Sequence, residues 1–135
     1  RRVRSVGDML PSHLPGTPVL THGDASADQV LYEYSTGRIW LTDFDRVRLA
    51  PAAMDLGSYL AEAPSCQRHA LLEGYAAHRP VPGDEELGWA IALSRLARLA
   101  DPLRRAHPSW RERISADLAA IERIARSPEK EAGWA

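Results

Sequence analysis

Two short apolar stretches joined by a polar turn constrain the fold of this chain more than any other feature. Gln29–Tyr34 (QVLYEY) mixes β-branched, aromatic and polar residues, and Ile39–Thr42 (IWLT) repeats that character after the turn Ser35–Arg38 (STGR). Such residues favour strands, and the glycine of the turn accepts a positive φ. The pattern predicts a β-hairpin that runs from Gln29 to Asp43.

Polar side chains gather at both open ends of this hairpin. The tripeptide His-Gly-Asp at 22–24 precedes the first strand, and Asp-Phe-Asp at 43–45 follows the second. Because a hairpin brings its two ends together, we expect Asp24, Gln29 and Asp43 to meet in space. Each aspartate taken singly is also typical of a turn. Three oxygen donors at the mouth of an otherwise apolar hairpin nevertheless indicate a site.

These donors suit metal-assisted phosphoryl transfer. Mg²⁺ prefers oxygen ligands and keeps several waters, so one or two carboxylates and an amide oxygen suffice. Transfer to a hydroxyl also requires a carboxylate that orients this hydroxyl. On this reasoning Asp24 serves the acceptor hydroxyl, Gln29 and Asp43 hold the metal, Gly23 allows a sharp backbone path, and His22 braces the loop.

The pattern changes to helical spacing after Pro51. Proline residues, acidic first turns and apolar stripes predict helices within residues 51–63, 64–78, 83–102 and 109–126. The expected fold class is therefore α+β and mainly helical, with a β-hairpin region followed by about four helices.

One domain is expected between a lead-in segment and a tail. Residues 1–17 are predicted to form the lead-in segment, with one short helix around Ser5–Leu10. The domain then covers 18–126, divided into a hairpin part (18–48) and a helical part (51–126), and residues 127–135 are predicted to be a frayed tail.

Composition and charge exclude several classes of protein. The formal net charge of −1 provides no general attraction to nucleic acid or to a membrane surface. No apolar run approaches the ~20 residues of a membrane span. The single cysteine, Cys66, excludes an internal disulfide and a Cys-rich metal site, and a cytoplasmic location is expected. The first residue is Arg1 rather than methionine, which favours a fragment or a processed product.

The segment from Leu20 to Leu60 resembles the core of the aminoglycoside phosphotransferase and choline kinase group, which are small-molecule kinases with a protein-kinase-like fold. The HGD motif at 22–24 matches the family's first element and puts Asp24 at the position of the catalytic base. The DFD motif at 43–45 matches the second, with Asp43 as the metal ligand and Asp45 in support. The motif Asp-Leu-Gly at 55–57 matches the third, in which Asp55 is a structural brace.

The resemblance implies a phosphotransferase that uses Mg²⁺ and ATP (or GTP) to phosphorylate a hydroxyl of a small molecule, such as a metabolite or an antibiotic. It implies that residues 18–126 correspond to the C-terminal lobe of the fold. The family's Gly-rich loop and phosphate-binding lysine have no counterpart before Leu20, and the sole lysine is Lys130. Without an N-terminal lobe the isolated chain is expected to be inactive or to self-associate through uncovered apolar surface.

One departure from the family concerns a metal ligand. Gln29 stands where the family usually has asparagine, and its amide oxygen lies one methylene further from the backbone. Maltokinase-like branches of the group resemble this chain here, which favours an acceptor other than an aminoglycoside. The helical part carries more arginine than acid, so a neutral sugar-like acceptor is as compatible as an aminoglycoside. No residue is assigned to acceptor binding.

Two other functions compete with the kinase. A non-catalytic, pseudokinase-like binding domain would explain the missing nucleotide lobe. A metal-dependent phosphoesterase would use His22 with Asp24, Asp43 and Asp45, although such sites usually contain more histidines. Trp89, Trp110 and Tyr75 have two interpretations as well, as core residues on the apolar stripes or, less favoured, as stacking platforms for a sugar.

Overall fold

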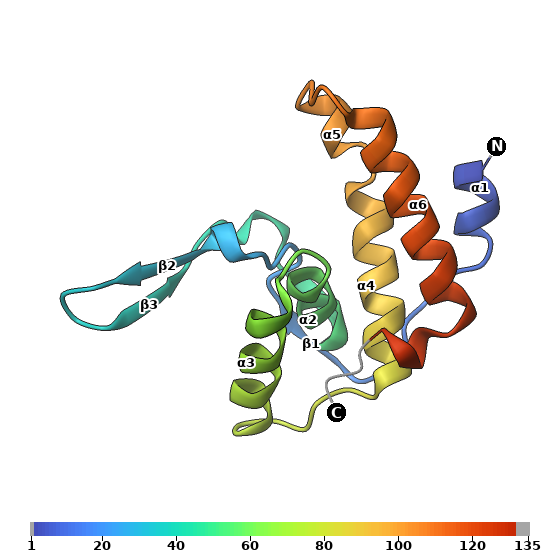
Figure 1. Cartoon of the computed structure of the whole chain (residues 1–135). Coiled ribbons are helices and arrows are strands. Elements are labelled where there is room, and N and C mark those ends of the chain that lie inside the picture. Colours follow the sequence, from blue (N-terminus) through green and yellow to red (C-terminus); the bar gives the residue numbers. More distant parts are fainter. Residues whose placement is uncertain (1, 132–135) are drawn as a thin grey trace.

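The computed structural model describes residues 2–131, which form two small antiparallel sheets and a group of helices (Figure 1). The strands are β1 (Pro18–Thr21), β2 (Val30–Glu33), β3 (Arg38–Leu41) and β4 (Arg48–Pro51). The helices are α1 (Arg2–Gly7), α2 (Ala53–Leu60), α3 (Ser65–Ala76), α4 (Asp84–Arg98), α5 (Asp101–Arg104) and α6 (Trp110–Arg126). Short 3₁₀ turns lie at Ala27–Gln29, Phe44–Arg46 and Pro128–Lys130.

The predicted hairpin is confirmed. Strands β2 and β3 pair antiparallel from Val30 opposite Leu41 to the turn, where Gly37 adopts a φ of +70°. The amide of Thr42 donates to the carbonyl of Gln29 at 3.0 Å and extends the pairing toward the polar ends. In Figure 1 this hairpin projects away from the helices, and every residue of β2 and β3 except Val30 is exposed.

A second strand pair joins the two ends of the hairpin region to each other. Strand β4 pairs with β1 antiparallel, and Thr21 lies opposite Arg48. The sequence analysis predicts no strand over Arg48–Pro51, so β4 is an addition. Its pairing is nevertheless important, since it clamps the segment 22–47 at its base and holds the HGD and DFD motifs close together.

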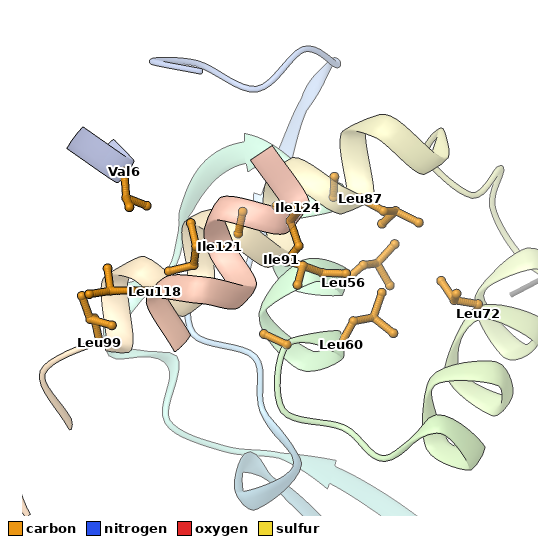
Figure 2. Packing of buried hydrophobic residues seen from close by; sticks show 14 residues of the cluster. Val6, Leu56, Leu60, Leu72, Leu87, Ile91, Leu99, Leu118, Ile121 and Ile124 are labelled. Atoms are coloured by element: carbon orange, nitrogen blue, oxygen red, sulfur yellow. The ribbon is translucent and has the colours of Figure 1, made fainter. Parts of the chain in front are cut away.

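The core lies between the helices (Figure 2), where α2 packs on α4 and α4 on α6. Gly57 permits the first contact, because a Cβ at that position would lie 2.4 Å from the Cβ of Ala90. Helices are confirmed in all four predicted segments. The short helix α5 is additional, and it turns the chain between α4 and α6. The labelled side chains in Figure 2 are Val6, Leu56, Leu60, Leu72, Leu87, Ile91, Leu99, Leu118, Ile121 and Ile124.

The N-terminal segment contributes to this core. Its helix covers Arg2–Gly7 rather than Ser5–Leu10, and Val6 is fully buried beside α6. Arg2 forms an ion pair with Glu122 of α6 at 3.0 Å. The prediction of a mere lead-in segment is therefore wrong for this part of the chain, because a single buried valine anchors the helix.

The segment after α6 is also packed, at least as far as Glu131. Pro128 is buried against α4, where Gly88 has no side chain; a Cβ there would lie 2.0 Å from the carbonyl oxygen of Pro128. The frayed tail predicted from Ser127 is thus wrong for residues 127–131, and residues 132–135 lie outside the described part. Among residues 2–131 no helix is long and apolar enough to cross a membrane.

Candidate functional site

Asp55, at the start of α2, holds the backbone of the HGD motif. Its two carboxylate oxygens accept the amide of His22 at 2.7 Å and the amide of Gly23 at 2.9 Å. Gly23 has a φ of +85°, and a Cβ there would lie 2.1 Å from the carbonyl oxygen of Arg46. The loop before Asp24 is therefore fixed between the first turn of α2 and the turn that follows Asp43.

His22 braces this loop from within. The residue is 8% exposed, its ring lies 4.9 Å from that of Phe44, and its Nε2 lies 2.7 Å from the carbonyl oxygen of Thr42. A carbonyl can only accept, so Nε2 carries the hydrogen. The other ring nitrogen, Nδ1, is buried and has no partner among the described residues. These contacts indicate that His22 has a structural role at the base of the hairpin.

Gln29 and Asp43 meet at the base of the hairpin, as the sequence predicts. The amide nitrogen of Gln29 donates to Asp43 Oδ2 at 3.1 Å, and its amide oxygen lies 3.4 Å from Thr42 Oγ. Asp43 adopts a left-handed conformation with a φ of 62°, which is uncommon for a residue other than glycine. Sparsely populated backbone conformations of this kind gather at functional sites.

The donors at this position would supply two oxygen ligands to Mg²⁺, so the ion would need further ligands from outside the protein. Among residues 2–131 no group of three His, Cys, Asp or Glu side chains is placed to hold a metal ion. One carboxylate from Asp43 and one amide oxygen from Gln29 would leave the remaining positions to water and phosphate oxygens. Mg²⁺ is held in this way in nucleotide-dependent enzymes.

Asp24 is held by two arginines. Arg98 of α4 approaches Asp24 Oδ1 at 2.6 Å, and Arg46 approaches Oδ2 at 3.2 Å. Arg98 is itself fixed, because it donates to the backbone oxygen and the hydroxyl of Ser58 in α2. The structure thus places Asp24 in the same cleft as Gln29, and its carboxylate pairs with the two guanidinium groups.

The remaining acidic residues of the region differ in their surroundings. Asp45 is exposed, and the described part of the chain provides no hydrogen-bonding or ion-pairing partner for its side chain. Asp28 accepts a hydrogen bond from the hydroxyl of Ser26, and this bond holds the pKa of Asp28 below its usual value. The positive charges of Arg98 and Arg105 lower that pKa further.

A cleft of about 840 Å³ opens between the HGD loop and the helices α2, α4, α5 and α6. Its walls contain seven arginines and five carboxylates, so positive charge prevails. Trp89, Trp110 and Tyr75 do not line it, which removes them as stacking platforms there. Tyr75 packs against the core, whereas Trp89 and Trp110 are half-buried.

A family model of the phosphotransferase enzyme family (APH) matches residues 1–89. The chain belongs to this family. The match includes all three motifs and extends from the first residue into α4, beyond the segment 20–60 on which the resemblance rests. No curated protein and no solved structure matches the chain.

Family membership confirms the resemblance and indicates an enzyme of the phosphotransferase, kinase-like type. The mainly helical α+β architecture is compatible with a kinase-like lobe. One residue beside Asp24 escaped the sequence analysis, namely Arg98. It lies 74 positions further along the chain and outside the matched range, so no local pattern connects the two residues.

Proposed function

We propose that the chain is the catalytic and acceptor-binding part of a phosphotransferase that moves a phosphoryl group from Mg²⁺-bound ATP or GTP to a hydroxyl of a small molecule. The observation that carries this proposal is the joint arrangement of the three motifs. Asp55 fixes the loop that presents Asp24 to the cleft, and the same hairpin base brings Gln29 to Asp43.

The carboxylate of Asp24 binds the acceptor hydroxyl in this mechanism. This carboxylate orients the hydroxyl and accepts its proton, while the new phosphate ester bond forms at the γ-phosphorus and the bond from that phosphorus to the departing nucleoside diphosphate breaks. Arg98 and Arg46 hold the carboxylate in one orientation, because each guanidinium approaches one of its two oxygens. An acceptor hydroxyl must therefore bond to Asp24 beside these guanidiniums or displace one of them.

Gln29 and Asp43 would hold the magnesium ion. When bound, the ion neutralises negative charge on the nucleotide phosphates. The hydrogen bond between the two side chains keeps them together before the ion binds. His22 and Asp55 support this end of the site through the backbone and the base of the hairpin.

A further lobe or a second chain would cover the hairpin. Several apolar side chains of β2 and β3 are exposed, including Ile39 at 66% and Trp40 at 52%. Contiguous exposed apolar surface of this kind marks an interaction site. We assign this face to the nucleotide-binding lobe of the kinase, with self-association as its substitute in the isolated chain. Such an enzyme would work in the cytoplasm, where its nucleotide is made.

The test compares thermal unfolding with and without Mg²⁺ and ATP for the wild type, Asp43→Asn and a control, Asp8→Asn. Asp8 is exposed at the end of α1, outside the cleft. A ligand at 100 times its Kd stabilises a protein by about 2.7 kcal/mol, which is a shift of several degrees here. We expect the shift in the wild type and in Asp8→Asn and its loss in Asp43→Asn.

Phosphoryl transfer is then assayed in the full-length gene product that carries these residues. Asp24→Asn should retain the nucleotide-dependent shift and lose transfer, because asparagine keeps the size of the side chain but cannot accept the proton of the hydroxyl. Substantial transfer by either aspartate variant would refute the assignment.

One observation favours a second candidate, a non-catalytic binding domain. Both oxygens of Asp24 are paired with arginine, which is a stable arrangement without any substrate. This candidate expects no nucleotide-dependent shift and no transfer in the wild type.

A further inference from the structure

The helical wall of the cleft carries two arginines that the protein itself does not neutralise. Arg95 pairs with Asp117 at 3.2 Å, and Arg104 approaches Asp101 at 3.5 Å. Arg105 and Arg113 are exposed and also line the cleft. Within residues 2–131 neither of them forms an ion pair with a carboxylate.

The backbone after α5 is arranged so that two cleft-lining residues flank one strained position. Ala106 adopts a φ of 49°, and its amide donates to Leu103 O at 3.0 Å while that of His107 donates to Pro102 O at 2.9 Å. This is a Schellman helix end, whose left-handed residue is usually glycine. The backbone of Ala106 is therefore strained, and the residues on both sides of it, Arg105 and His107, line the cleft.

His107 adds a hydrogen-bond donor to the same wall. Its Nδ1 accepts the amide of Ser109 at 3.1 Å, so the neutral ring carries its hydrogen on Nε2. His107 lines the cleft together with Arg105 and Arg113. Two guanidinium groups and one imidazole N–H make a set of donors without an acceptor, which is the composition of an anion site.

This wall and the proposed catalytic loop line the same cleft. Asp28 belongs to the segment between Asp24 and the hairpin, and the charge of Arg105 contributes to the low pKa of Asp28. Arg105 therefore lies within electrostatic range of the loop that presents Asp24. Asp24 and the helical wall line one cleft, so a molecule that fills this cleft contacts both.

We propose that Arg105, Arg113 and His107 bind an anionic group of the acceptor, a phosphate or a carboxylate. This inference rests on the proposed function, because it names the class of substrate for that site. Guanidinium groups bind phosphate and carboxylate through paired hydrogen bonds. The same unpaired positive charges repel a polycation, so an aminoglycoside is disfavoured as the acceptor.

The test measures binding of three matched probes by calorimetry, without nucleotide: glucose, glucose 6-phosphate and gluconate. The proteins are the wild type, Arg105→Gln/Arg113→Gln, and a control, Arg79→Gln/Arg126→Gln, which removes the same charge from exposed positions outside the cleft. We expect at least one anionic probe to bind about tenfold or more tighter than glucose. This preference should vanish in the cleft variant and persist in the control.

Three results would overturn the inference. The first is a Kd for both anionic probes that lies within about threefold of the Kd for glucose, and this includes the case in which all three probes bind weakly. The second is a preference that survives in Arg105→Gln/Arg113→Gln or is lost equally in the control. The third is displacement of the anionic probe by Mg²⁺ and ATP, since the arginines would then belong to the nucleotide.

Asp43→Asn separates this inference from the proposed function. Anion binding that persists in Asp43→Asn, combined with no nucleotide-dependent shift in the wild type, would leave the anion subsite standing and refute the kinase. A wild type that shows the nucleotide-dependent shift but no preference for the anionic probes would refute the anion subsite and leave the kinase standing.

Discussion

Replacement of Asp55 by asparagine tests how the fold positions the loop that carries Asp24. Asp55 accepts two backbone amides, one on each carboxylate oxygen. Asparagine has nearly the same size and keeps one acceptor oxygen, but its amide nitrogen can only donate. One of the amides of His22 and Gly23 must then lose its partner and face another donor.

The expected cost follows from these two bonds. A hydrogen bond to a charged group contributes about 1.5–3 kcal/mol, and a neutral one about 1 kcal/mol. His22 is buried, so water does not readily replace the lost acceptor. Loss of one charged bond and weakening of the other amount to about 2–4 kcal/mol, which is a large part of the ~5–15 kcal/mol that stabilises a typical domain.

Urea denaturation of Asp55→Asn, the wild type and Asp8→Asn measures this cost. Asp8 has an exposed side chain, and its replacement should change the free energy of unfolding by less than about 0.5 kcal/mol. Hydrogen exchange at the amides of His22 and Gly23 provides the local readout, and both amides should exchange faster. A free energy of unfolding within about 0.5 kcal/mol of the wild type, with unchanged exchange, would refute the role of Asp55 as the brace.

Three further predictions concern single contacts. Gly57→Ala should lower the free energy of unfolding by about 1–3 kcal/mol or more in urea denaturation, because α2 and α4 touch at this position. Gly74→Ala should raise the free energy of unfolding by about 0.5–1 kcal/mol, because the space around Gly74 on α3 is open. Equal effects would contradict this. Ala106→Gly should raise the melting temperature by relieving a left-handed backbone, worth up to about 1 kcal/mol, and a lower value would count against strain at that position. Ser26→Ala removes the hydrogen bond that lowers the pKa of Asp28, so it should destabilise the protein at neutral pH. The difference in the free energy of unfolding between this variant and the wild type should shrink as the pH falls through the acid range, where Asp28 becomes protonated. A difference that is independent of pH would contradict this.

Much of the local structure can be predicted from residues that are close together in the sequence. The hairpin β2–β3 and the helices α2, α3, α4 and α6 follow from the spacing of apolar residues, from the turn glycine and from proline and acidic residues at helix starts. The contact between Gln29 and Asp43 follows as well, because a hairpin must bring its own ends together. Motifs of this short range carry the family resemblance that the match to the phosphotransferase enzyme family confirms.

The rest depended on contacts between distant parts of the chain. Strand β4 pairs with β1, Val6 fills a space beside α6, and Pro128 packs on Gly88; none of these segments has a strong preference of its own. Packing and long-range pairing decide such segments, and sequence periodicity does not record them.

The surroundings of Asp24 show the same division. The sequence by itself determined that Asp24 belongs to a phosphotransferase motif, because the motif is local. Only the tertiary structure brought Arg98 to its carboxylate and gathered Arg105 and Arg113 in the same cleft. An arginine on a helix looks like any solvated residue until the fold decides what it faces, since its charge acts over a few ångströms of space and not along the chain.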